Sequence, residues 1–201
     1  MPAHELRARP VKAKRVLILG GPGSGKTTLA RTLATLLSAP CRELDRLAYD
    51  SPDGRNEAPF WQWTRTSDGV RRERAAELAT TETWVAEGLY AGWTSALRDA
   101  ADVVVWLDLP TRMTTWRVVR RAIEHRLRGG SDWDVRSAVR VARGSRSYRS
   151  RPLATAEQLH ERDGANGTRT LEQFVSLVAD KTIRCRTAAD VRRTTDWLSS
   201  A

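Results

Sequence analysis

The sequence of 201 residues contains only two cysteines, Cys41 and Cys185. They lie far apart and lack the spacing of metal ligands, which argues against a disulfide framework or a zinc site and predicts reduced thiols. The chain also lacks an apolar run of the roughly 18 residues that a membrane-spanning helix needs, and nothing in it resembles a signal peptide. We therefore expect a soluble cytoplasmic protein, with no membrane partner, whose length suffices for one domain and its core.

Lysine is also scarce, although the chain is basic. The formal net charge is +10, yet only four of the 34 basic residues are lysines: Lys12, Lys14, Lys26 and Lys181. The positive charge is therefore mostly arginine, which fits either an anionic partner, such as nucleic acid or a phosphorylated small molecule, or a habit of composition. The sequence has no helix-turn-helix, zinc-finger or aromatic RNA-binding signature, so we expect at most non-specific nucleic-acid association. Residues 1–13 are predicted to form a basic, flexible tail.

The rest of the chain alternates between apolar strands and amphipathic helices. We expect strands at 15–19, 41–44, 83–88, 102–110 and 182–186. Helices are expected at 25–38, 68–80, 93–100, 111–128, 135–160 with a break at Pro152, 169–179 and 188–198. The alternation predicts an α/β fold with a five-stranded parallel sheet and helices on both faces, formed by a single domain over residues 14–201. Gly, Asn and Asp residues indicate flexible connections at 161–169 and 127–132.

The stretch LILGGPGSGKTTLA, residues 17–30, contains a nucleotide-binding motif. Gly20, Gly25, Lys26 and Thr27 fit G-x-x-x-x-G-K-[ST] between an expected strand and an expected helix. Glycines let backbone amides turn toward phosphates, and the helix N-terminus adds the positive end of its dipole. Lys26 is expected to reach the β- and γ-phosphates of ATP, and Thr27 to ligate Mg²⁺. The expected nucleotide-binding residues are Gly20, Gly21, Pro22, Gly23, Ser24, Gly25, Lys26, Thr27 and Thr28.

Two of the expected strands end in an acidic residue that could complete a magnesium site. Glu87 closes WVAEG and Asp108 closes VVVWLD. Either carboxylate could hold the ion through water, as a Walker-B-type residue does. Asp108 could instead cap the helix that starts near Pro110, because aspartate is favoured before a first turn led by proline. We assign the metal to Thr27 and Glu87.

Five stretches, taken in order, resemble the adenylate-kinase-like P-loop kinases, and most of all their topology modulation (FlaR-like) branch. They are GGPGSGKTT, ELD, WVAEGLYAGW, ADVVVWLDLPTRMTTWRVVRR and RTAADVRRTTDWL, and they span nearly the whole chain. The resemblance implies a P-loop NTPase (nucleotide-kinase-like) fold with a helical lid, here over 126–151, and an acceptor-binding segment, here over 46–82. Arg117 and Arg121 follow Leu109-Pro110 at the family's offsets. They are implied to contact the ATP phosphates or stack on adenine.

The sequence also departs from the family. Glu87-Gly88 stands where the family has aspartate and glycine near Mg²⁺, and EGLYAGW lacks the arginine that grips a nucleoside monophosphate, so adenylate kinase activity itself is not expected. Asp45 either orients the acceptor hydroxyl, as the family implies, or is a surface aspartate. Trp61 and Trp63 either stack on a ring or pack locally. The lid-like region is rich in arginine: Arg126, Arg128, Arg140, Arg143, Arg146, Arg149 and Arg151. At least one of Arg143, Arg146 and Arg149 is expected to reach the phosphates.

The sequence therefore predicts an ATP-dependent phosphotransferase that acts on a small-molecule acceptor, such as a nucleoside, nucleotide or other metabolite. The catalytic residues are predicted to be Lys26, Asp45, Glu87, Arg117 and Arg121, with ATP and Mg²⁺ as cofactors. Two alternatives remain open at this point. One is a nucleotide-dependent, DNA-associated regulator, and the other is an NTPase switch that has no acceptor.

Overall fold

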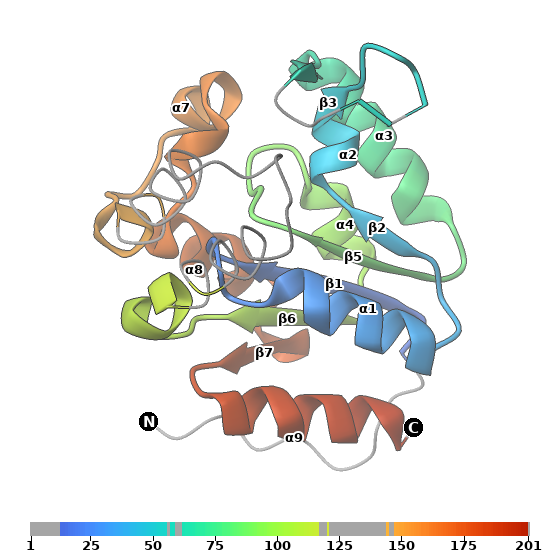
Figure 1. Ribbon diagram of the computed structural model, residues 1–201, viewed down its shortest axis with the longest axis vertical. Coiled ribbons are helices and arrows are strands. Elements are labelled where there is room, and N and C mark those ends of the chain that lie inside the picture. Colours follow the sequence, from blue (N-terminus) through green and yellow to red (C-terminus); the bar gives the residue numbers. More distant parts are fainter. Residues whose placement is uncertain are drawn as a thin grey trace.

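A parallel sheet of five strands runs through the molecule (Figure 1). The computed structural model describes residues 13–55, 57–58, 62–116, 120, 144 and 147–200. The sheet order is β2-β5-β1-β6-β7. Its strands are β1 (Arg15–Gly20), β2 (Cys41–Glu43), β5 (Trp84–Gly88), β6 (Val103–Leu107) and β7 (Thr182–Cys185).

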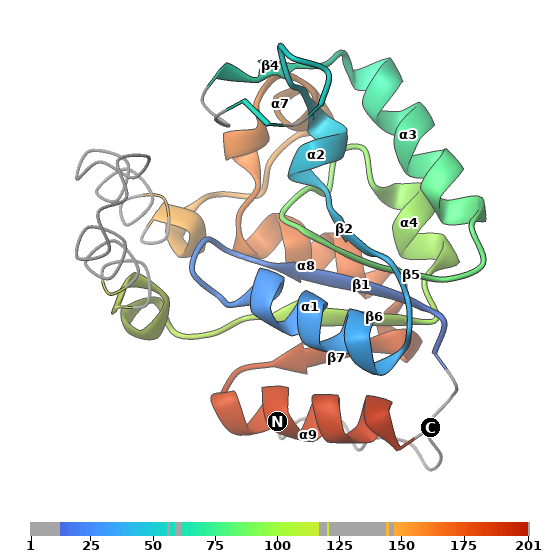
Figure 2. The same cartoon turned by 45° about the vertical axis from the view of Figure 1, so that its right-hand side comes forward.

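Helices cover both faces of this sheet, as predicted. One face carries α1 (Lys26–Leu36) and α9 (Ala188–Ser199), which contact each other. In Figures 1 and 2, α1 is drawn in front of β1 and β6, and α9 lies below β7. The other face carries α3 (Asp68–Thr80), α4 (Ser95–Ala100) and α8 (Thr168–Ser176). None of the helices in the described residues is long and apolar enough to cross a bilayer.

The strand sequences explain the two layers. Val16 and Ile18 of β1 join the apolar cluster under α1 and α9, whereas Leu17 and Leu19 join the cluster under α3, α4 and α8. Successive side chains of a strand point to opposite faces of the sheet, so a strand covered on both sides reads as a continuous apolar run. The unbroken run VLIL is therefore what a central parallel strand requires.

The strand order defines a P-loop NTPase fold of the α/β class. β1 lies between β5 and β6, and it leads through the glycine loop into α1. The chain order reverses at β1, and open parallel sheets bind ligands beyond the carboxyl ends of the strands at such a point. The predicted fold class is thus confirmed for the sheet and its flanking helices. Most of the lid-like segment, together with residues 1–12, lies outside the described residues.

A group of short elements lies beyond one end of the sheet, at the top of Figure 1. It was not expected from the sequence, because strands of two residues carry no periodicity. It consists of helix α2 (Asp45–Ala48), the antiparallel pair β3 (Tyr49–Asp50) and β4 (Thr64–Arg65), and helix α7 (Ala156–Glu161). The described chain also includes the 3₁₀ helices η2 (Asp163–Ala165) and η3 (Ala179–Lys181) and helical residues at 111–116 and 147–150.

The break expected at Pro152 is present: the chain is not helical over 151–155, and α7 begins after Thr155, whose capping box with Gln158 starts a new helix. One expectation needs correction. The expectation that residues 161–169 form a flexible connection is wrong. Asn166 is buried, its side-chain oxygen accepts from the Ala91 amide at 2.9 Å, and its amide group donates to the Asp163 carbonyl at 2.9 Å. Side-chain hydrogen bonding therefore fixes a stretch whose composition suggested mobility.

Close packing around Gly88 yields a stability prediction. A Cβ atom on Gly88 would lie 2.8 Å from Leu44 Cδ1 and 2.9 Å from Leu44 Cβ, and Leu44 is fully buried. We expect Gly88→Ala to lower the free energy of unfolding by about 1–3 kcal/mol, as overpacking does. Gly69→Ala in α3 is the matched control, because its Cβ would meet nothing closer than Ser67 Oγ at 4.0 Å. Urea unfolding midpoints measure both changes, and equal midpoints would contradict the packing argument.

Candidate active site

The glycine loop between β1 and α1 has the conformation that phosphate binding needs. Gly23 and Gly25 have φ angles of 74° and 92°, in the left-handed region that favours glycine. Gly25 caps α1, so Lys26, Thr27 and Thr28 form the first helical turn. The amides of this turn and the helix dipole both favour an anion at this position. The structure therefore keeps all the predicted nucleotide-binding residues in one loop.

Thr27 and Glu87 meet at the carboxyl ends of β1 and β5. The Thr27 hydroxyl donates a hydrogen bond of 2.5 Å to Glu87 Oε1, and Glu87 pairs with Ile18 in the sheet register. Glu87 is only 7% exposed. Burial raises its pKa, although the positive charge of Lys26 and the hydrogen bond from Thr27 act in the opposite direction. The Lys26 ammonium donates to the Gly21 carbonyl at 3.3 Å.

Asp108, the other candidate for the metal, is bound to two arginines. Arg184 donates to its Oδ2 from Nε at 3.1 Å and from Nη2 at 2.8 Å, and Arg149 Nη2 donates to its Oδ1 at 2.8 Å. The Arg184 guanidinium also lies 4.0 Å from the centre of the Trp106 ring. The capping role considered for Asp108 is therefore wrong among the described residues, because both carboxylate oxygens accept from arginine side chains rather than from helix amides.

Asp45 lies at the start of α2, just after β2. Its carboxylate is exposed, and the Tyr90 hydroxyl donates to its Oδ1 at 2.5 Å. Tyr90 is 7% exposed, and its ring packs on Trp93 with centroids 5.0 Å apart. Because β2 pairs with β5 at Glu43 and Glu87, Asp45 and Glu87 lie at the same end of the sheet. Sequence reasoning missed Tyr90, since a single tyrosine after a strand has no spacing signal.

The structure does not test several of the predicted residues. Arg117, Arg121 and Trp61 lie outside the described residues, and so do Arg126, Arg128, Arg140, Arg143 and Arg146. Of the lid-like arginines that are described, Arg149 binds Asp108, and Arg151 donates to the Asn166 carbonyl and the Ser147 hydroxyl. Trp63 Nε1 donates to the Ala58 carbonyl at 2.8 Å, which ties this ring to its own segment.

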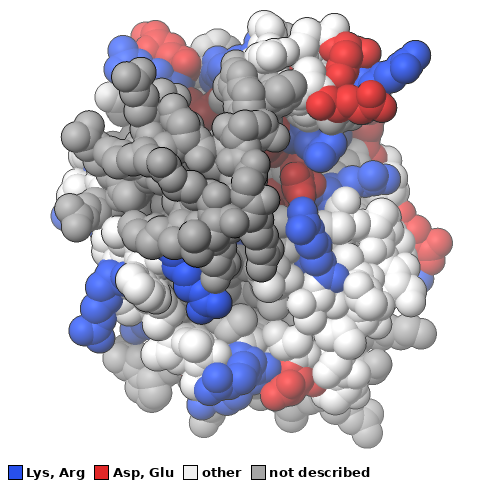
Figure 3. Space-filling model, viewed as in Figure 1, with Lys and Arg blue, Asp and Glu red and all other residues white. Residues whose placement is uncertain are grey.

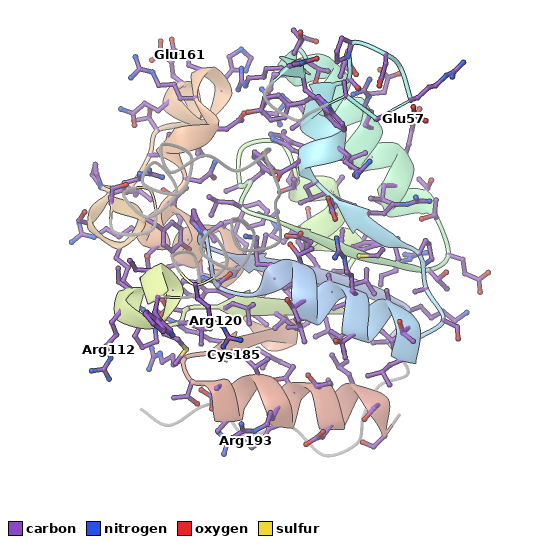
Figure 4. The ribbon with its side chains drawn as sticks, viewed as in Figure 1. Glu57, Arg112, Arg120, Glu161, Cys185 and Arg193 are labelled. Carbon is purple, nitrogen blue, oxygen red and sulfur yellow. The ribbon has the colours of Figure 1, made fainter. Side chains whose placement is uncertain are left out.

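A small pocket opens beside the glycine loop, next to the helix at 111–116 that follows β6. Tyr148 forms one of its walls and covers Gly21 so closely that a Cβ there would lie 2.8 Å from the ring. Figure 4 shows Arg112 of the same helix pointing away from the body of the molecule. The pocket is lined by Gly21, Pro22, Ser24, Leu107, Leu109, Thr111, Thr114, Tyr148 and Arg149.

The donors at the loop fit a nucleotide and a magnesium ion. Within the described ranges, no group of three or more His, Cys, Asp or Glu residues could hold a metal. Magnesium is usually bound through one or two carboxylates together with substrate phosphates and water, not by a protein cage. The Thr27 hydroxyl and the Glu87 carboxylate are oxygen donors of the required type, and they meet directly at the first turn of α1.

Comparison with known proteins gave structural likeness but no sequence relative. No protein-family model and no curated protein matches the chain. Similar solved structures include a shikimate kinase from Acinetobacter baumannii, with 21% identity, a TM-score of 0.47 and 92% of each chain covered. A gluconokinase from Sinorhizobium meliloti has 16% identity and a TM-score of 0.46, over 92% of this chain and 91% of the other. An uncharacterized protein from Eubacterium ventriosum has 15% identity and a TM-score of 0.48, over 94% and 99%. The assignment of the fold rests on the strand order and the loop described above.

Substitutions at Glu87 and Asp108 should affect different properties: the first should lower turnover, and the second should lower stability. Glu87→Gln keeps an oxygen for Thr27 and removes a buried charge, so we expect stability to hold while magnesium-dependent turnover falls by about 100-fold or more. Asp108→Asn removes the charge that faces two arginines, and we expect it to cost about 1–3 kcal/mol, since both arginines are partly exposed. Urea unfolding and steady-state turnover, measured on both variants, test this assignment of the metal to Glu87. Loss of turnover in the Asp108 variant alone would reverse the assignment.

The raised pKa of Glu87 also predicts a dependence on pH. A carboxyl whose pKa is higher in the folded than in the unfolded protein holds its proton more tightly when folded. The wild type should therefore lose stability relative to Glu87→Gln as the pH rises through the ordinary range of glutamate, and the difference should level off above the raised value. Unfolding midpoints of the two proteins between about pH 4 and pH 7 measure this difference. A constant difference would show that Glu87 is not destabilised by its burial.

Proposed function

We propose that the protein is a kinase that transfers the γ-phosphoryl group of ATP to a hydroxyl group of a small molecule. The observation that carries this proposal is the arrangement of two carboxylates at one end of the sheet. Glu87 is buried against Thr27 in the phosphate-binding turn, whereas Asp45 is exposed and held by Tyr90. A buried carboxylate suits a metal site, and an accessible one suits a hydroxyl acceptor.

Each residue then has a role in the transfer. Lys26 and the loop amides bind the β- and γ-phosphates, and Thr27 and Glu87 hold Mg²⁺, which supplies positive charge to the phosphates when bound. A bond forms between the acceptor oxygen and the γ-phosphorus, the bond from that phosphorus to the β–γ bridging oxygen breaks, and Asp45 accepts the hydroxyl proton. Phosphoryl transfer depends mainly on positioning and on charge stabilisation, which this set of groups provides.

The proposal extends to the lid-like arginines. Arg149 stands at the pocket beside the glycine loop with 41% of its side chain exposed, and it supports a role for this segment near the phosphates. Arg117 and Arg121 stay predictions, as does the likeness to the FlaR-like branch. On the face in Figure 3, acidic side chains of the described residues lie next to basic ones at the top and on the right, whereas basic side chains alone are seen at the lower left. The proposal of a small-molecule substrate rests on the site and not on this distribution of charge.

The loop lysine provides the direct test. We expect Lys26→Ala to lower ATP-dependent phosphorylation by about 100-fold or more while the protein stays folded, because the lysine places charge on the phosphates and does not pack in the core. Lys14→Ala is the control, since Lys14 is exposed and pairs with Glu82. ADP and phosphorylated acceptor are measured over a panel of nucleosides, nucleotides, sugars and acidic metabolites, alongside circular dichroism. Normal turnover in the folded Lys26 variant would refute the kinase proposal.

The same assay separates the two alternatives. Free phosphate in excess over phosphorylated product would indicate an NTPase switch. On the kinase proposal, DNA binding near physiological salt should be sequence-indifferent, with a Kd of roughly 10⁻⁴ to 10⁻⁶ M, and Arg117→Ala or Arg121→Ala should impair turnover. Tight, sequence-selective DNA binding together with normal turnover in both arginine variants would favour a regulator instead.

A further inference from the structure

Asp163 of η2 binds a cluster of side chains from the elements above the sheet. Its Oδ2 accepts from the Tyr49 hydroxyl at 2.8 Å and from Arg65 Nε at 3.0 Å, and its Oδ1 accepts from Arg71 Nη1 at 2.8 Å. The Asp163 side chain is only 15% exposed. One internal carboxylate therefore occupies two guanidinium groups, which come from β4 and α3.

A second carboxylate completes the neutralisation of Arg71. Asp68 Oδ1 accepts from Arg71 Nη2 at 3.1 Å, and the Arg71 side chain is fully buried. Arg65 Nη2 also donates to the His160 carbonyl at 2.8 Å. Charge-assisted bonds of this kind are short and strong, and removing one partner of a buried pair is costly. A substrate anion could bind these arginines only by displacing a carboxylate that the fold already holds in place.

This cluster adjoins the proposed acceptor site. Tyr49 stands opposite Arg65 in the β3–β4 pair, and Tyr90, the partner of Asp45, is buried close by. Burial raises the pKa of both tyrosines, and the negative charges of Asp45 and Asp163 raise them further. Both carboxylates therefore act on both phenols. Arginines compensate Asp163 and Asp68, whereas the exposed carboxylate of Asp45 accepts from the Tyr90 hydroxyl. The described part of the acceptor site therefore offers hydrogen-bond acceptors and one carboxylate that is not paired with an arginine.

Two other arginines around this end are also paired with carboxylates. Arg46 pairs with Glu43 at 3.5 Å and Arg74 pairs with Asp50 at 2.8 Å. Arg151 is different, because the Asn166 carbonyl and the Ser147 hydroxyl accept from its guanidinium. Its side chain packs on Gly167, where a Cβ would lie 2.7 Å from Arg151 Cβ. Burial lowers the pKa of Arg151, and Tyr148 beside the glycine loop acts on it in the opposite direction.

We propose that the acceptor is a hydroxyl compound without an acidic group, such as a nucleoside, a neutral sugar or an amino sugar. This proposal rests on the kinase function proposed above. The carboxylate and phenol oxygens of Asp45 and the two tyrosines suit hydroxyl or ammonium donors. Arg65 and Arg71, the cations that would suit a carboxylate or a phosphate, are occupied by Asp163. The acceptor is therefore selected by its hydroxyl groups. An anionic substituent is disfavoured because the nearby arginines are already paired and because the Asp45 carboxylate would repel it.

Matched pairs of acceptors test this proposal in the wild-type protein. In each pair the ring system stays the same and one exocyclic group is neutral or acidic: glucose and glucuronate, and adenosine and adenosine 5′-monophosphate. The assay measures both the phosphorylated product and the released ADP. We expect kcat/KM for the neutral member to exceed that for the acid by about tenfold or more. A preference for the acids would overturn the charge proposal and leave the kinase function standing. If all compounds give only free phosphate, the kinase function fails, and the charge proposal is then judged by binding.

Binding of malonate, a small dicarboxylate, is the second arm. The glycine loop is first saturated with Mg²⁺ and a non-hydrolysable ATP analogue, so that it cannot take the probe. We expect the wild type to show no saturable binding by calorimetry. Asp163→Asn removes the carboxylate charge that faces Arg65 and Arg71, while Asp68 stays paired with Arg71. This variant should show saturable malonate binding, at least about tenfold tighter than the detection limit that the wild type sets. Asp180→Asn is the control, because Asp180 is exposed in η3 and lies in another part of the chain.

The malonate titration of the wild type tests the proposal even if the Asp163 variant does not fold. Saturable malonate binding by the wild type would overturn the proposal, and its loss in Arg151→Gln would place the anion site at Arg151. Binding that is no tighter in a folded Asp163→Asn protein than in the wild type would also overturn it, because the two arginines would then not be held in reserve by Asp163.

Discussion

The position of β1 between two parallel neighbours is the constraint on which the site depends. Leu19 pairs with Gly88 on one side and with Trp106 on the other, so β5, β1 and β6 end at nearly the same level. Parallel strands bring their carboxyl ends to one edge, and the glycine loop, Glu87 and Asp108 therefore meet there although they are far apart in the sequence. Burial of both faces of these strands fixes the arrangement, because a shift in register would break two apolar layers at once.

The two acidic residues at this edge show how neighbours decide chemistry. Glu87 faces a threonine hydroxyl and a glycine loop, and burial raises its pKa. Asp108 is equally buried, but Arg149 and Arg184 take up its oxygens. A carboxylate that is compensated by two guanidinium groups anchors structure, whereas one that lacks such compensation suits a cation brought by a ligand. Asp108 thereby links the end of the lid-like segment to β7, and Glu87 stays with the phosphate-binding turn.

The arginine content acquires a local meaning in the structure. Arg65, Arg71, Arg149 and Arg184 all bind carboxylates, and several of these pairs join elements that are distant in the sequence. Arginine suits this use because its planar group donates to more than one oxygen at a time. A net charge of +10 is therefore compatible with arginines that are engaged in ion pairs within the fold. Composition described the average of the chain, and the fold placed a minority of acidic residues where they act.

The sequence by itself determined the α/β class, the five parallel strands and the glycine loop, since these follow from local periodicity and from a motif with fixed spacing. It offered Glu87 and Asp108 as candidates for the metal, and the structure brought Glu87 to Thr27. Only the tertiary structure decided that Asp108 anchors two arginines, that Tyr90 holds Asp45, and that Asp163 closes off Arg65 and Arg71. These contacts join residues from 41 to 98 positions apart. No local pattern encodes such a distance, because the partners meet only after the apolar layers have packed and oriented the elements that carry them.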